Sequence, residues 1–375
     1  MSHLRHPLLL LVSLVVLSIL ALAGGGSFTG SFATTTFLAS TVPANGDVNP
    51  YGVFVVPRTT GKLVQGHILV SNFNNAPTAL NPGGEQGTGI TIVDMSPDAA
   101  DNPPTAKVFA KIRNRDLPGP CPGGVGLTTA LVVLRSGWVI VGSLPTSDGT
   151  AATAQAGCLI VLDSYGHVVR TFSGGTINGP WDMAVLDGGD VAELFVTNVL
   201  NGTVAAGGDT VNRGTVLRIL LAVPDGFAPI EVLRTVIGSG FMERTDPEAL
   251  VIGPTGVGLG PNGTLYVADT LANRIAAIPN AVFRVTSAGT GKTVSIGGGL
   301  NGPLGLVIAP NGNILTVNSN DGNLVETTPG GFQFAPIPID TSGQGAGTLF
   351  GLAVAPGGNG VYFVDDGDNT FDILH

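Results

Sequence analysis

The sequence contains few charged residues, few aromatic residues and almost no cysteine. Lys and Arg number 16 against 26 Asp and Glu, the net charge is −10, and charged residues make up only 11% of the 375. Because basic residues are scarce and unclustered, the chain lacks the positive surface that nucleic acids and anionic membranes attract. We therefore expect no nucleic acid among its partners.

Several catalytic and cofactor motifs are also missing. Beyond the first 23 residues the only histidines are His67, His167 and His375, and their spacing is unlike that of zinc ligands. There is no C-x-x-C-H for haem attachment and no G-x-S-x-G nucleophile motif. We expect His67 to be a hydrogen-bonded strand residue.

The only long apolar run lies at the N-terminus. A short polar start with Arg5 and His6 precedes the apolar stretch 8–22, and Ala21-Leu22-Ala23 fits a signal-peptidase site. The apolar run is shorter than the ~20 residues that span a bilayer, and no stop-transfer charges follow it. We expect residues 1–23 to be a signal peptide cleaved near Ala23, a secreted or periplasmic protein, and no membrane span after cleavage.

The two cysteines are Cys121 and Cys158. In an exported protein such a pair most simply forms one disulfide. The repeat pattern described below supports this pairing, because it puts both residues at the same end of one antiparallel unit. The alternative is two buried free thiols.

Turn-forming residues and short apolar runs dominate what remains. The chain has 57 Gly and 26 Pro without collagen periodicity, and its 43% hydrophobic content argues against disorder. One pattern, a short apolar run, a turn and a second apolar run with a polar end, occurs six times. The first runs are 50–57, 127–134, 180–187, 254–261, 303–310 and 349–356, and the polar ends are Asn72, Ser143, Asn198, Asp269, Asn318 and Asp365.

Such repeats predict an all-β fold, a six-bladed β-propeller formed by a single domain over 24–375. Each unit reads as up to four short strands, and units of this kind bury their apolar faces only by stacking on one another. Blades begin near 50, 127, 180, 254, 303 and 349, with insertions at 73–88 and 201–213. The last blade has only three strands of its own. The β-forming segment 33–42 is expected to supply the fourth by pairing with 371–375.

One face of the propeller collects the starts of the first runs. Tyr51, Trp181 and Phe350 would make the mouth of the central tunnel partly aromatic, beside Thr255. This mouth is the predicted ligand-binding face. The alternative is that these side chains simply fill the tunnel.

Asp182 breaks the repeat. It stands beside Trp181 at the position that Gly52, Gly256 and Gly305 hold in other blades. A carboxylate there is a candidate ligand or general base, and a role in a turn is the alternative.

The polar ends form a second candidate site on the same face. Short polar side chains at strand ends usually support the next turn, and this is the favoured interpretation. The alternative is a Ca²⁺ or Mg²⁺ site formed by carboxylate and amide oxygens. The candidate metal ligands are Asp182, Asn198, Asp269 and Asp365.

The stretch 253–275, GPTGVGLGPNGTLYVADTLANRI, resembles the NHL repeat. The matching residues are Pro254, Gly256, Val257, Gly263, Leu265, Tyr266, Val267, Ala268, Asp269, Thr270, Asn273, Arg274 and Ile275. The resemblance implies a six-bladed propeller, in a continuum with the gluconolactonase and senescence-marker lactonases. Those lactonases hold a divalent metal at the mouth with Glu, Asn and Asp, whereas only Asp182 and Asn198 match here and the first blade has no entrance Glu.

Two functions follow as expectations. The first is an exported scaffold that binds a small-molecule or protein ligand at the tunnel mouth. The second is a metal-dependent lactonase or esterase that uses Asp182 and its Asn and Asp neighbours.

Overall fold

The computed structural model describes residues 25–103, 105–340 and 348–375. The predicted signal peptide and its cleavage site lie outside these residues. Within them, no helix has the length and apolar character needed to cross a membrane.

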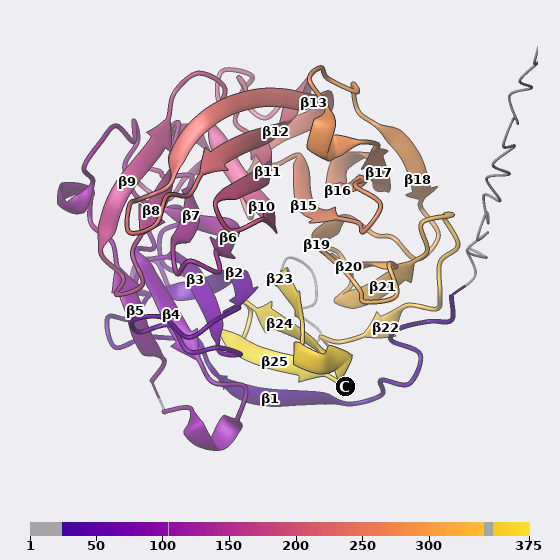
Figure 1. Cartoon of the computed structure of the whole chain (residues 1–375), viewed down its shortest axis with the longest axis horizontal. Helices are drawn as coiled ribbons and strands as arrows, with labels where there is room; N and C mark the ends of the chain where they lie inside the picture. Colours follow the sequence, from indigo (N-terminus) through magenta and orange to yellow (C-terminus); the bar gives the residue numbers. More distant parts are fainter. Residues whose placement is uncertain (1–24, 104, 341–347) are drawn as a thin grey trace, which may run out of the picture.

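The described strands form six sheets arranged around a central axis, which confirms the six-bladed β-propeller (Figure 1). Each blade starts with an inner strand next to the axis. The inner strands are β2 (Val48–Val55), β6 (Leu127–Val133), β10 (Gly179–Asp187), β15 (Pro254–Leu259), β19 (Pro303–Ile308) and β23 (Leu349–Val354).

The remaining strands continue outward as antiparallel meanders. In the first three blades they are β3 (Ile68–Asn74), β4 (Thr91–Met95), β5 (Lys107–Lys111), β7 (Val139–Ser143), β8 (Cys158–Leu162), β9 (Val168–Ser173), β11 (Val191–Val199), β12 (Val211–Ala222), β13 (Ile230–Asp246) and β14 (Leu250–Ile252). In the last three they are β16 (Leu265–Asp269), β17 (Arg274–Ile278), β18 (Lys292–Ile296), β20 (Ile314–Asn318), β21 (Asn323–Thr327), β22 (Ile337–Pro338), β24 (Val361–Asp365) and β25 (Thr370–Leu374).

Helical structure is limited to six single turns of 3₁₀ helix among the described residues. They are η1 (Ala99–Asp101), η2 (Asn114–Asp116), η3 (Ala151–Thr153), η4 (Thr270–Ala272), η5 (Ala281–Phe283) and η6 (Pro356–Gly358).

The third blade departs from the four-stranded pattern. Its sheet has five strands in the order β10-β11-β12-β13-β14. β12 begins at Val211, inside the expected insertion 201–213, because this stretch pairs with the long strand β13. The chain then folds back at the end of β13 to form β14. This extra strand lies over one end of the central tunnel, as described below.

The N-terminal strand closes the ring, as the sequence predicts. β1 (Thr35–Ser40) pairs antiparallel with β25, from Thr35 opposite Leu374 to Ser40 opposite Thr370. Figure 1 shows β1 along the outer edge of the last blade, beside the C-terminus. The last sheet therefore has four strands, in the order β1-β25-β24-β23.

A second anchor, which sequence analysis did not detect, holds the chain just before β1. The buried carboxylate of Glu326 accepts hydrogen bonds from Ser27 Oγ (2.6 Å), Phe28 N (2.7 Å), Thr29 N (2.9 Å) and Thr29 Oγ1 (2.7 Å). Burial raises the pKa of Glu326, but hydrogen bonds from Ser27, Asn313, Phe28 and Thr29 outweigh it and lower this pKa to about 2. Glu326 thus ties the N-terminal segment to the fifth blade.

Cys121 and Cys158 form the predicted disulfide, with a Cα–Cα distance of 5.1 Å and a sequence separation of 37. The bond joins the segment before β6 to the first residue of β8. It therefore ties the entry of the second blade to its third strand.

Replacing both cysteines with serine should lower the free energy of unfolding by about 4 kcal/mol, because opening a loop of this length restores that much entropy to the unfolded chain. Urea unfolding of the double variant and the wild type measures the difference. Dithiothreitol should bring the wild type to the midpoint of the variant and leave the variant unchanged. A wild-type midpoint that does not respond to full reduction would contradict the expectation.

Candidate functional site

The inner strands enclose a cavity of about 320 Å³ on the axis of the ring. It is lined by the middle and C-terminal parts of these strands. Residues near the C-terminal ends of these strands are partly exposed, for example Val55, Val185, Leu259 and Ile308. Residues near the N-terminal ends are buried. The cavity therefore opens at the C-terminal ends of the inner strands, on the face opposite the predicted tunnel mouth.

The predicted mouth itself is filled by stacked aromatic rings. Tyr51 stacks on Phe350 at 3.8 Å between ring centroids and on Phe73 at 4.5 Å, and Trp181 lies 6.0 Å from Phe350. Tyr51, Trp181 and Phe350 are each at most 4% exposed, and the pocket beside Tyr51 and Trp181 has a volume of only about 10 Å³. At this end the aromatic side chains fill the tunnel, which was the alternative to a ligand-binding mouth.

The extra strand of the third blade covers this aromatic plug. The Trp181 indole Nε1 donates to the carbonyl of Val251 in β14 (3.2 Å), and Leu250 packs into the same cluster. Leu250 has φ +63°, a conformation that is uncommon for leucine. Gln86, from the insertion of the first blade, donates to the carbonyl of Pro247 (2.8 Å). A ligand would reach the aromatic rings only by displacing this segment.

Two further properties fit a packing role at this end of the tunnel. Thr255 is fully buried, and its hydroxyl lies 2.7 Å from that of Thr270 and bonds to nearby carbonyls. Burial and, secondarily, the nearby Asp366 raise the pKa of the Tyr51 hydroxyl well above its usual value. We therefore place the candidate site in the open cavity on the other side of the plug.

Asp182 lines that cavity rather than the aromatic mouth. Each inner strand has a register shift at this repeat position, between Pro180 and Met183 in β10. Such a bulge re-aims side chains, so Trp181 lies in the plug and Asp182 in the cavity. The Asp182 backbone N–H donates to the hydroxyl of Thr197 (3.0 Å), which in turn donates to the carbonyl of Thr255 (2.6 Å) in the next blade. These two hydrogen bonds fix the position of β10, which carries the carboxyl group.

The Asp182 carboxyl group is buried and lies against backbone of the neighbouring blade. Its Oδ2 accepts a hydrogen bond from Val257 N at 2.9 Å. Burial raises the pKa of this carboxyl to about 7, against the smaller opposing effect of hydrogen bonds from Met183 and Val257. A carboxyl group whose pKa is raised toward neutral pH suits a general acid or base that works near that pH.

Thr129 holds the equivalent ring position in the second blade and was not among the predicted site residues. Its hydroxyl is buried without a hydrogen-bond partner in the described part of the chain, and Thr129 lines the same cavity as Asp182. At the equivalent positions of the last two blades a side chain cannot fit. A Cβ on Gly305 would lie 1.7 Å from the carbonyl oxygen of Phe350, and one on Gly351 2.2 Å from that of Tyr51. Only the second and third blades thus present side chains at this level of the ring.

The other candidate metal ligands make their contacts outside the cavity lining. Asn198 Oδ1 accepts from Asn178 N (2.8 Å), and Asp365 Oδ1 accepts from Gly367 N (2.9 Å). Asp269 accepts from the guanidinium of Arg274, with Nε 2.8 Å from Oδ2. Of these contacts, that of Asp365 is the kind expected of a polar strand end that supports the next turn.

The structure does not assemble the candidate ligands into one metal site. Across the described ranges, no group of three or more His, Cys, Asp and Glu residues is arranged to hold a metal ion. Asp182 lies in the cavity without the other three. The four candidate ligands therefore do not form a common Ca²⁺ or Mg²⁺ site among the described residues. A metal site elsewhere on this face stays a prediction.

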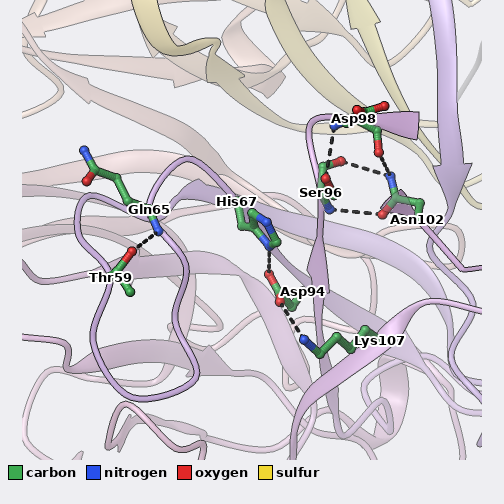
Figure 2. A network of polar contacts seen from close by, with 8 residues as sticks. All are labelled: Thr59, Gln65, His67, Asp94, Ser96, Asp98, Asn102 and Lys107. Carbon is green, nitrogen blue, oxygen red and sulfur yellow. Dashed lines mark hydrogen bonds and ion pairs between the residues drawn. The ribbon is translucent and has the colours of Figure 1, made fainter. Parts of the chain in front are cut away.

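His67 belongs to a polar network at one end of β3, β4 and β5 in the first blade (Figure 2). Its Nδ1 lies 3.0 Å from Asp94 Oδ1, and Lys107 Nζ lies 3.8 Å from Asp94 Oδ2. Nearby, Asn102 bonds to the backbone of Ser96 in the turn that contains η1. His67 is thus a hydrogen-bonded strand-edge residue outside the cavity lining.

Comparison with known proteins identifies the fold. No protein-family model and no curated protein matches the chain. Among solved structures, a gluconolactonase from Xanthomonas campestris matches with a TM-score of 0.54 at 13% identity, covering 91% of this chain and 88% of the other. The likeness shows that the two proteins share the six-bladed propeller fold. The finer resemblance to NHL repeats remains a prediction.

Two further solved structures agree with this assignment. A luciferin-regenerating enzyme matches with a TM-score of 0.53 at 10% identity, covering 91% of this chain and 95% of the other. A calcium-binding regucalcin from Agrobacterium tumefaciens matches with a TM-score of 0.52 at 13% identity, covering 90% and 93%. At these identities the likeness establishes the architecture, and the site has to be argued from its own residues.

The buried carboxyl groups predict how stability depends on pH. Burial is the main cause that raises the pKa of Asp182, Glu243 and Asp365 to about 7 each. Between about pH 4 and 7 the folded protein therefore holds protons that the unfolded chain has released, so stability falls as pH rises. For Asp182 alone the loss from pH 5 to pH 8 should be about 3 kcal/mol.

Urea unfolding at pH 5 and pH 8 checks this expectation. The wild type should be more stable at pH 5, and Asp182→Asn should reduce the difference between the two pH values by about 3 kcal/mol. Asp190→Asn, an exposed carboxylate in the next turn of the same blade, is the control and should leave the difference unchanged. Equal pH dependence of the wild type and Asp182→Asn would show that the Asp182 carboxyl titrates normally.

Proposed function

We propose that the protein hydrolyses a small lactone or ester in the central cavity, with Asp182 as the general base. The observation that carries the proposal is the Asp182 carboxyl group, which is buried at the inner end of the cavity and has a pKa near 7. A base with a pKa close to the working pH is the most effective one. The relation of the fold to gluconolactonase-like enzymes supports a hydrolytic reaction of this kind.

The two polar side chains of the cavity suit the roles that the reaction needs. The Asp182 carboxylate accepts a proton from water as the water oxygen bonds to the substrate carbonyl carbon. The Thr129 hydroxyl is the candidate donor to the carbonyl oxygen, which gains negative charge. The C–O bond to the leaving oxygen then breaks, and the proton passes from Asp182 to that oxygen. A lactone gives a hydroxy acid, and Asp182 is ionised again.

The proposal includes no metal step, because Asn198, Asp269 and Asp365 are not part of the cavity lining and have other partners. Export remains part of the proposal. The disulfide is compatible with an oxidising compartment outside the cytosol.

A panel of lactones and esters tests this function on protein that is purified without chelator, with product acids measured by pH-stat. We expect turnover that survives EDTA treatment. Turnover that disappears with EDTA and returns with Ca²⁺ or Mg²⁺ would contradict the metal-free step. Absence of turnover across the panel, with lactone binding retained, would overturn hydrolysis and leave the ligand-binding scaffold as the function.

A further inference from the structure

Four consecutive blades carry an exposed aromatic side chain in the same connection. This connection joins the third strand of a blade to the fourth, from β8 to β9, β12 to β13, β17 to β18 and β21 to β22. The side chains are Tyr165 (54% exposed), Phe227 (69%), Phe283 (82%) and Phe332 (64%). In the described part of the chain, these three phenylalanines are the most exposed aromatic residues. We call the four residues the aromatic arc.

The aromatic arc lies on the face where the central cavity opens. In an antiparallel meander, the connection after the third strand lies at the same end as the C-terminus of the first strand. Because the blades repeat around one axis, the four connections lie at about the same height on this face. At the opposite end, the exposed large apolar residues of the described ranges are Leu80 and Ile296. The exposed aromatic groups are thus gathered on one face of the ring.

Charged residues are scarce on the part of this face that the fourth, fifth and sixth blades form. The guanidinium of Arg284, next to Phe283, donates to the carbonyl of Pro279 at 2.7 and 3.0 Å. The acidic residues of the face lie in the turns of the first three blades, for example Asp187 and Asp225. Four connections contain no charged residue, namely 260–264, 309–313, 328–336 and 355–360. This part of the face therefore loses few hydrated charges when it leaves water.

The chain also enters the fold on this face. Asn311, in the turn between β19 and β20, donates through Nδ2 to the carbonyl of Gly26 (3.0 Å). The Glu326 carboxylate holds the three residues that follow, as described above. The apolar stretch 8–22 is thus joined to the domain at this point. A membrane that binds this stretch during export would lie against the same face.

We propose that this face docks on a zwitterionic lipid surface, with the aromatic arc inserted among the head groups. Aromatic side chains bind such an interface through their apolar area. A lipid surface is flat and accepts side chains from separate blades, whereas a protein partner or a second copy needs a continuous patch of about 800 Å². The net charge of −10 opposes binding to anionic lipid, so the attraction is apolar. Docked in this way, the protein has its cavity opening toward the lipid.

Flotation with phosphatidylcholine vesicles tests the docking, with the chain that starts at residue 24. Binding should persist at high salt and should not increase when phosphatidylserine is added. Phe283→Ser should lower the partition coefficient about 10-fold, and the triple variant Phe227→Ser, Phe283→Ser, Phe332→Ser about 100-fold or more. Phe37→Ser is the matched control, because Phe37 is 58% exposed on β1, at the outer edge of the last blade. It should bind like the wild type.

Tryptophan fluorescence tests which face meets the lipid. Phe283→Trp and Phe37→Trp are each mixed with vesicles of phosphatidylcholine that carries bromine on its acyl chains. The signal added by Phe283→Trp should be quenched, because the side chain lies in the interface. The signal added by Phe37→Trp should be unchanged. Equal quenching in both variants would contradict the orientation.

The other outcomes decide between lipid and different occupants of this face. Absence of binding to any vesicle, or a triple variant that binds like the wild type, would overturn the proposal. Binding that requires phosphatidylserine and disappears at high salt would overturn apolar docking. A dimer in sedimentation that the triple variant abolishes would assign the face to a second copy and overturn the lipid. Vesicle binding and lactone turnover are separate measurements, so failure of one leaves the other proposal standing.

Discussion

A chain that starts at residue 45 should melt about 10 °C or more below a chain that starts at residue 27. The shorter chain lacks β1, so β25 becomes an unpaired edge and the last blade loses its fourth strand. It also lacks the donors of four hydrogen bonds to Glu326, and a hydrogen bond to a charged group contributes about 1.5–3 kcal/mol. Each kcal/mol corresponds to about 2–4 °C in a domain of moderate size.

A third chain separates the two contributions. Starting at residue 33 removes Ser27, Phe28 and Thr29 but keeps β1 and its pairing with β25. Its melting temperature, from calorimetry at pH 7, should lie between the other two. The chain that starts at residue 27 should match the longer protein that starts at residue 24. If all these chains have the same melting temperature, the N-terminal strand does not stabilise the ring.

Replacement of Asp182 with Asn should lower kcat for the best lactone at least 100-fold, because general-base catalysis contributes about 10²–10⁴. The wild-type rate should rise with pH through about 7, as the Asp182 carboxyl loses its proton. The variant should retain binding of the lactone, since the amide keeps the size of the carboxyl group. Stopped-flow and calorimetric measurements on both proteins provide kcat, its pH profile and Kd.

Asp190→Asn again provides the control, because it removes one negative charge from the same blade outside the cavity. It should leave kcat and its pH profile unchanged. A wild-type rate that is flat between pH 5 and pH 9, or an Asp182→Asn variant with full activity, would remove Asp182 from the mechanism. Thr129→Val should lower kcat without shifting the profile, since the hydroxyl does not titrate in this range.

The repeat pattern was sufficient to predict the architecture. In the second blade it predicts strands at 129–134, 138–142, 158–163 and 167–172, and the structure has β6, β7, β8 and β9 within two residues of these ends. Local signals carry this information, because apolar runs and turn residues alternate in every unit. Gly137, with φ +90° in the turn between β6 and β7, is one such signal.

The position of the site depends on features that a repeat pattern does not encode. Sequence analysis singled out Asp182 as a break in the repeat and placed its side chain at the aromatic mouth beside Trp181, whereas the structure places it in the cavity. The bulge in β10 and the cover supplied by β14 place Trp181 and Asp182 in separate compartments. Both features arise from contacts between blades, which lie far apart in the sequence.

Thr129 and Glu326 were missed for different reasons. Thr129 also replaces the ring glycine, in LTTALVVL, so comparison of the repeat copies would have revealed it. Glu326 resembles any other strand residue until the N-terminal segment, almost 300 residues away, folds onto it. A buried carboxylate that binds a distant segment leaves no local pattern.

A crystal structure of Asp182→Asn soaked with the best lactone or ester of the panel tests the site most directly. We expect the ligand in the cavity between the inner strands, with its carbonyl group within hydrogen-bond distance of Thr129. The aromatic plug of Tyr51, Trp181 and Phe350 should remain closed. Lactone bound among those aromatic rings, or an empty cavity at a concentration well above Kd, would contradict the assignment of the central cavity as the substrate site.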